Sequence, residues 1–329
     1  MTFCFIDDTM STQLLREIIG DVSREAIKQW LKISGFRHTA NNEADFYKLL
    51  NELITKGDLR IERLRRLVLE IEEYRAKRIY LGKLINSKTI GLRQKFENHL
   101  NSIGLRLAPE PVKAKELPSR PHLNYICWSQ KEVRIGYSET HEFRKVSFAN
   151  DTIKWESETN LITISAEPST GFIKIMMDSP GEKNIHKVGY GTKNIDNYVN
   201  FYKKKAVELL GASEFKSIDL LKVSEGIVKA RPKIFAPTDF HKLSSFHSSY
   251  RIKSRSDVTD DPVFTASEKA DGEGQVHEGV SGYWLPEASE GQLQRRLFMQ
   301  LSRREDMIRF DAECLASEVE YAVSRIRAV

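Results

Sequence analysis

The 329-residue sequence is poor in cysteine and histidine, and this limits the chemistry that it can carry. Its three cysteines, Cys4, Cys127 and Cys314, lack the paired spacings of zinc sites and disulfide frameworks. Of its eight histidines only His241 and His247 lie close together, and their separation does not place both on one face of a helix. We therefore expect no metal site, no disulfide framework and a reducing intracellular environment.

Long apolar runs and the familiar catalytic motifs are also missing. No run approaches the ~18 apolar residues that a membrane span needs, and the N-terminus lacks the basic and apolar regions of a secretory signal. The sequence contains no G-x-G-x-x-G, P-loop, H-E-x-x-H or G-x-S-x-G pattern. We expect no membrane association, no cofactor and no catalytic residues, in a protein that is cytoplasmic or associated with DNA.

What the sequence does have is an uneven distribution of charge around a net charge of +5. Residues 60–95 contain eleven Lys or Arg against four Glu, and residues 203–255 contain twelve against five acidic residues. Residues 257–291 contain nine acidic groups and one Lys. Clustered Lys and Arg displace the counterions that condense on nucleic-acid phosphates, so two basic segments are typical of a nucleic-acid-binding protein. A solvated charged surface is the alternative explanation.

Residues 23–57 have the pattern of two short amphipathic helices joined by a polar turn. Ser23 is suited to cap the first helix, and Gly35 is suited to end it. The second helix carries an apolar stripe at i, i+3, i+4, i+7 and i+8 spacing, formed by Phe46, Leu49, Leu50, Leu53 and Ile54.

This pair of helices resembles the SAP-type helix–turn–helix module, which grips DNA in its family. The resemblance covers about a tenth of the chain. It departs from the family at the start of the second helix, where Asn42, Glu43 and Ala44 replace the usual Gly and Lys. The resemblance implies a DNA partner; a plain helical hairpin used for packing or protein contact is the alternative.

The chain continues with further helical patterns. Leu64, Leu67, Ile71, Tyr74, Arg78, Leu81 and Ile85 recur at alternating spacings of three and four. The spacing predicts one long helix from about Asp58 to Ile85, whose heptad seam Leu64–Ile85 could support self-association. A further helix is expected from Ile90 to Ile103. Residues 1–107 are therefore predicted to form an all-helical N-terminal domain.

A change in composition then marks a boundary between domains. Residues 108–121 hold four prolines and no apolar period, which predicts a linker. Residues 122–329 are predicted to form a mixed, mainly antiparallel α+β domain, because alternating strand patterns are followed by helical ones. It ends in a helix that the stripe from Ile308 to Ile326 predicts. The expected fold class of the chain is thus α+β, with an all-helical N-terminal domain.

The charge pattern and the SAP resemblance lead to a non-catalytic nucleic-acid-binding protein, with DNA favoured over RNA, that contacts phosphates through two basic surfaces. The order of parts also resembles kinetochore proteins that bind centromeric nucleosomes. The phosphate-contacting residues are predicted to be Lys28, Lys32, Arg63, Arg66, Arg75, Arg78, Lys203, Lys204, Arg231, Arg251, Lys253 and Arg255.

Two other functions stay open. The chain could be a scaffold or a subunit of a larger complex, whose acidic segment 257–291 pairs with a basic protein partner. It could also be a metal-dependent nuclease built on Asp219, Glu225 and Lys229, although their spacing does not match the usual D…E-x-K pattern of such enzymes.

Overall fold

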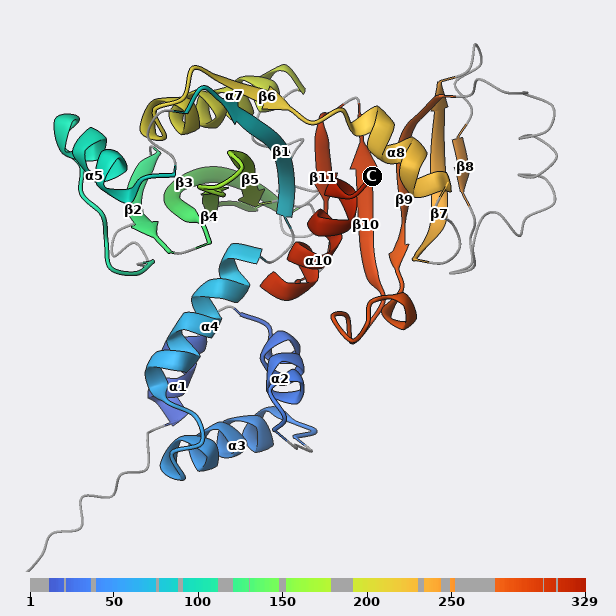
Figure 1. Ribbon diagram of the computed structural model, residues 1–329. Coiled ribbons are helices and arrows are strands. Elements are labelled where there is room, and N and C mark those ends of the chain that lie inside the picture. The colour runs from blue at the N-terminus through green and yellow to red at the C-terminus, as the bar shows by residue number, and fades with distance from the viewer. Residues whose placement is uncertain are drawn as a thin grey trace, which may run out of the picture.

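The computed structural model combines four N-terminal helices with a large antiparallel sheet that carries helices on both faces (Figure 1). It describes residues 12–20, 22–36, 40–74, 77–87, 91–111, 121–129, 131–147, 152–178, 192–229, 234–243, 249–251, 276–303, 305–311 and 313–329.

The N-terminal helices pack around a core of their own, and together they are called the helical unit here. They are α1 (Thr12–Ile19), α2 (Arg24–Ile33), α3 (Glu43–Thr55) and α4 (Ile61–Tyr74). Leu15, Ile27, Leu50 and Leu64 are fully buried in this core, because the apolar stripe of each helix faces its neighbours. Leu315, from the other end of the chain, completes the same core.

Local capping explains where α2 and α3 begin and end. The hydroxyl of Ser23 accepts a hydrogen bond from the Glu25 amide at 3.2 Å, and Asn42 caps α3 by accepting one from the Asp45 amide at 2.8 Å. Beyond α2, Gly35 adopts a φ of 85°, and the Phe36 amide bonds back to the Leu31 carbonyl at 2.9 Å. The two helices therefore occupy the predicted segments, and their membership of the SAP family stays a prediction.

The prediction of an all-helical N-terminal domain is wrong. Helix α4 ends at Tyr74, and Lys77–Ile85 forms strand β1 in the centre of the sheet. The seam predicted a helix because β1 buries both of its faces, so its apolar residues do not alternate and also fit a helical period. Gly82 marks the difference: a Cβ there would lie 2.8 Å from the Lys216 carbonyl oxygen of a paired strand.

The same correction removes the basis for self-association through Leu64–Ile85. The α4 part of the seam is buried inside the chain, with Leu64 and Ile71 at 0 % exposure, and the β1 part is paired with other strands. Neither part presents a helical seam to a second copy.

The sheet contains eleven strands within the described residues, in the order β2-β3-β4-β5-β1-β11-β10-β9-β7-β8, with β6 paired to the far end of β1. The first half comprises β2 (His122–Trp128), β3 (Val133–Ser147), β4 (Thr152–Ala166) and β5 (Phe172–Asp178). The second half comprises β6 (Glu214–Ser217), β7 (Phe235–Leu243), β8 (Ser249–Arg251), β9 (Val276–Trp284), β10 (Leu297–Ser302) and β11 (Met307–Arg309).

Strand β1 joins the two halves, since it pairs with β5 on one side and with β11 and β6 on the other. Its alternating side chains enter two different cores. Ile79 and Leu81 belong to the core that α8 (Leu220–Lys229) and α10 (Ala316–Arg327) cover. Tyr80 and Leu84 belong to the core that α5 (Arg93–Ser102) and α7 (Thr192–Leu209) cover.

Other expectations for the C-terminal part meet mixed outcomes. The mainly antiparallel arrangement expected after residue 122 is present in β2 to β5, which pair with one another in chain order. The tail differs from its prediction: Ile308 lies in β11, and the final helix begins only at Ala316. Residues 112–120 of the expected linker lie outside the described residues.

None of the helices in the described part of the chain has the length and hydrophobicity that crossing a membrane requires.

Candidate nucleic-acid interface and the adjoining polar network

Three of the predicted cations lie on the surface of the helical unit, and Arg63 lies where α2 meets α4. Lys32, Arg63 and Arg66 are exposed. The Arg63 guanidinium carbon lies 4.8 Å from the centre of the Trp30 ring, so this contact fixes a cation at the junction of the two helices. Arg63 and Arg66 are three residues apart and therefore neighbour each other on α4.

Acidic side chains partly balance this surface. Lys28 pairs with Glu25 on α2 at 2.9 Å, and Arg66 pairs with Glu110 at 2.8 Å. The side chains of Arg66 and Glu110 are 73 % and 53 % exposed, so water screens their attraction and the pair contributes little to stability. Arg66 can therefore exchange Glu110 for a phosphate at small cost.

Arg78 does not belong to a basic surface. It lies in β1 with 7 % exposure, opposite Met177 of β5 and Arg309 of β11. A buried guanidinium in the centre of a sheet cannot reach a nucleic-acid backbone, so Arg78 does not contribute the phosphate contact that the sequence predicted for it.

The second predicted surface is described in part. Lys203 on α7 donates to Asp306 at 3.0 Å and to Ser217 at 3.2 Å, which ties it to the protein. Lys204 is exposed and lines an open groove of about 730 Å³ beside the exposed Phe201 and the half-buried Phe215. Arg251 lies in β8, opposite Asp239 of β7. Of the other predicted residues, those outside the described part of the chain are Arg75, Arg231, Lys253 and Arg255, as is most of the acidic segment 257–291.

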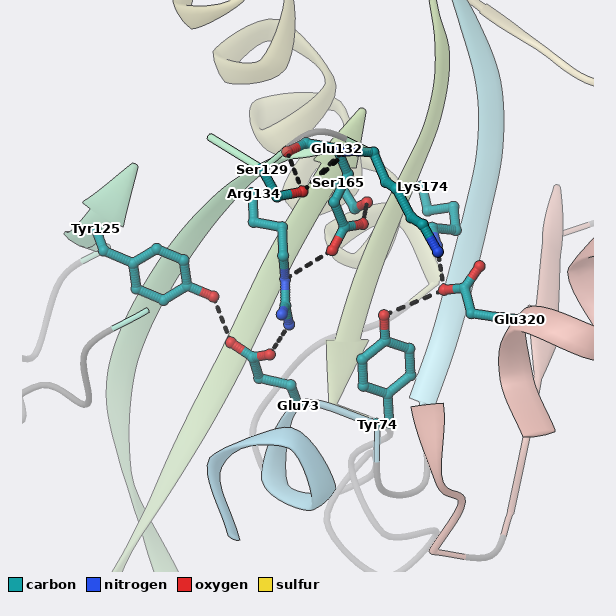
Figure 2. A network of polar contacts seen from close by, with 10 residues as sticks. Glu73, Tyr74, Tyr125, Ser129, Glu132, Arg134, Ser165, Lys174 and Glu320 are labelled. Atoms are coloured by element: carbon teal, nitrogen blue, oxygen red, sulfur yellow. Dashed lines mark hydrogen bonds and ion pairs between the residues drawn. The ribbon is translucent and has the colours of Figure 1, made fainter. Parts of the chain in front are cut away.

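A network of polar side chains connects the helical unit to the sheet (Figure 2). Glu73, near the end of α4, accepts hydrogen bonds from Tyr125 of β2 and from Arg134 of β3. Space for the Tyr125 ring comes from Gly136, where a Cβ would lie 2.2 Å from that ring. Neighbouring Tyr74 donates to Glu320 of α10 at 3.1 Å.

The network continues across the sheet on the same side. Glu320 also binds Lys174 of β5, and Ser165 of β4 donates to Glu132 (Figure 2). Glu132 in turn lies 3.4 Å from the Arg134 guanidinium. Segments from both ends of the chain thus meet through charges that the fold has largely removed from water.

These charges surround a cavity of about 490 Å³. Burial raises the pKa of Glu132, although a hydrogen bond from Ser165 and the charge of Lys174 oppose this rise. Burial likewise raises the pKa of Glu70, against the charge of Arg134. Within the described residues no group of acidic, histidine and cysteine side chains is arranged to hold a metal ion. The arrangement of opposite charges suits a joint between α4, the sheet and α10.

We expect the stability of this joint to depend on pH through Glu132. Because its pKa is raised, the folded state binds its proton more readily than the unfolded state, and stability declines as pH rises through the folded pKa. The variant Glu132→Gln lacks the desolvated charge. Its Tm should therefore exceed that of the wild type near neutral pH, and the difference should shrink towards pH ~4.

Glu167 provides a control, because its pKa is shifted in the opposite direction. Burial alone would raise the pKa of Glu167, but hydrogen bonds from Arg327 and Thr170 outweigh burial and lower it. Glu167→Gln should therefore lower the Tm near neutral pH, with a smaller loss in acid. Parallel Tm profiles for Glu132→Gln and the wild type across this pH range would contradict the assignment.

Two residues of the alternative nuclease site, Asp219 and Glu225, belong to the start and the body of helix α8. The Asp219 carboxylate accepts a hydrogen bond from the Leu221 amide at 3.1 Å at the start of α8, which is the role of a helix cap. Glu225 follows on the same helix and is half-buried. Cys127 and Cys314 are buried, and burial raises the pKa of the Cys127 thiol to about 11. A raised pKa disfavours the reactive thiolate.

No family model matches the chain, and the curated proteins include no match to it.

Proposed function

We propose that this protein binds nucleic acid without catalysis, and that it grips the phosphate backbone of duplex DNA through the α2/α4 surface formed by Lys32, Arg63 and Arg66. The observation that carries the proposal is the stacking of Arg63 on Trp30 at 4.8 Å between two helices with exposed cations. A cation held in place by an aromatic ring loses less side-chain freedom when it binds a phosphate. The exposed cations of α4 and the SAP resemblance of residues 23–57 support the same proposal.

The network of Figure 2 supports this function indirectly. Glu73 and Tyr74 tie the end of α4 to β2, β3 and α10, so the basic surface has a fixed orientation relative to the sheet. A rigid support allows cations on the helical unit and on the sheet to contact one backbone together.

The test is binding of labelled duplex DNA, single-stranded DNA and RNA over a series of salt concentrations from about 50 to 200 mM. We expect the wild type to bind duplex DNA most tightly. In the variant Lys32→Gln/Arg63→Gln/Arg66→Gln, the slope of log affinity against log salt should fall by about 1 for each phosphate that the protein no longer neutralises.

The control variant is Arg93→Gln/Lys95→Gln/Arg106→Gln, which removes the same charge from exposed positions on and after α5. Equal losses of affinity in the two triple variants would mean that net charge alone attracts DNA and would overturn the α2/α4 assignment. No binding of any nucleic acid by the wild type, even at low salt, would overturn the proposed function.

A further inference from the structure

Two lysines face each other across the pairing of β1 with β6. Lys83 is directly opposite Lys216 in the antiparallel register, so both side chains leave the same face of the sheet. Both are exposed, and Lys83 is the exposed residue in a strand that is otherwise buried or half-buried. Like charges that are directly opposite destabilise a strand pair, so this arrangement works against the fold.

Four other cations of the sheet have acidic partners. Lys77 pairs with Asp178, Lys174 with Glu320, Arg134 with Glu73, and Arg309 with Asp311. For Lys83 and Lys216, in contrast, the described residues provide no ion pair, even though Glu214 lies on the same face two positions along β6. The fold therefore neutralises these four cations and leaves Lys83 and Lys216 exposed to solvent.

A third cation extends the arrangement across the sheet. Lys83 is opposite Phe172 on its other side, in β5. The Arg327 guanidinium carbon of α10 lies 4.0 Å from the centre of the Phe172 ring, and Arg327 also pairs with Glu167. Neighbouring strands are about 4.8 Å apart, so Lys216, Lys83 and Phe172 form a row across three strands with Arg327 over its end.

We infer that Lys83 and Lys216 together bind a phosphate of the DNA backbone, and form the second contact of the protein with the same duplex. The inference rests on the proposed function, because it assigns the second basic surface to the β1–β6 pair. A phosphate between the two ammonium groups would convert their repulsion into two charge-assisted contacts. The shared direction of their side chains, fixed by the register, makes one anion accessible to both.

The experiment compares Lys83→Gln/Lys216→Gln with Lys95→Gln/Lys131→Gln in the full-length protein, by binding of labelled duplex DNA over the same salt series and by thermal unfolding. The control lysines are exposed and lie on α5 and in the β2–β3 turn. We expect the slope of log affinity against log salt to fall by about 1 in Lys83→Gln/Lys216→Gln alone. Its Tm should stay equal to or rise above that of the wild type, because a repulsion is removed.

The outcomes separate this inference from the proposed function. An unchanged slope in Lys83→Gln/Lys216→Gln, with a reduced slope in the α2/α4 variant, would overturn the second contact and leave the proposed function standing. A reduced affinity together with a lower Tm would indicate a damaged fold. The single variant Lys83→Glu then tests the inference, because the new carboxylate can pair with Lys216. It should raise the Tm and still weaken DNA binding. Failure of that variant to weaken binding would also overturn the inference.

Discussion

Loss of one member of the Lys77–Asp178 pair should lower the free energy of unfolding by about 3–5 kcal/mol. The Lys77 Nζ atom lies 2.5 Å from the Asp178 carboxylate, and the two side chains are 1 % and 7 % exposed. Asp178 also accepts a hydrogen bond from the Leu161 amide at 2.6 Å. The variant Lys77→Met would leave a carboxylate buried without its cation, which is the costly case. Urea unfolding monitored by circular dichroism measures the change.

Two further variants test the explanation for this loss of stability. Arg93→Met breaks the exposed Arg93–Glu97 pair on α5 and should cost less than about 1 kcal/mol. The double variant Lys77→Met/Asp178→Leu removes both charges and should recover much of the stability. If the double variant is as unstable as the sum of its single variants, the cost does not come from an unpaired charge.

The second large effect is expected at Glu318, where Glu318→Ala should cost about 3 kcal/mol. This carboxylate is 1 % exposed. It accepts a hydrogen bond from the side-chain amide of Gln29 on α2 at 2.8 Å. It also binds Arg295 at 2.9 and 3.0 Å and the Leu315 amide at 2.9 Å. One side chain thus caps α10 and holds the helical unit against it.

Hydrogen exchange distinguishes this role from a general loss of stability. In Glu318→Ala, amides of α2 and of the first turn of α10 should lose protection more than those of β3 and β4. Gln29→Ala removes one neutral donor to this carboxylate and should cost about 1.5 kcal/mol, less than Glu318→Ala. Equal loss of protection throughout the chain would contradict a local role for Glu318.

Parts of the fold with local signals could be predicted from the sequence. Ser23 and Gly35 mark the limits of α2 through hydrogen bonds to nearby residues, and the alternation from Val133 onward predicts a strand without knowledge of its partners. Strand β1 could not be predicted in this way. Its partners lie about a hundred or more residues away, at Met177 and Arg309 for Arg78, and its two buried faces erase the alternation.

The same distinction between local signals and distant partners applies to the candidate site. Exposed cations on α2 and α4 follow from the helical period, so Lys32 and Arg63 could be named from the sequence. From the sequence, Lys83 and Lys216 could be recognised only as members of basic segments. Their position opposite each other depends on the register of β1 and β6. The Gly82 that precedes Lys83 was a usable signal, because glycine costs about 1 kcal/mol relative to alanine inside a helix.

The position of β1 has a consequence for synthesis on the ribosome. Its partner strands β5, β6 and β11 follow it in the chain, and the last of them ends at Arg309. Strand β1 is therefore synthesised early, and both of its edges stay unpaired until most of the chain has been made. Unpaired strand edges promote aggregation, so the nascent chain depends on protection against it. Assembly of the sheet needs contacts of long sequence separation, so we expect folding to be slow and to finish only after the C-terminal residues leave the exit tunnel.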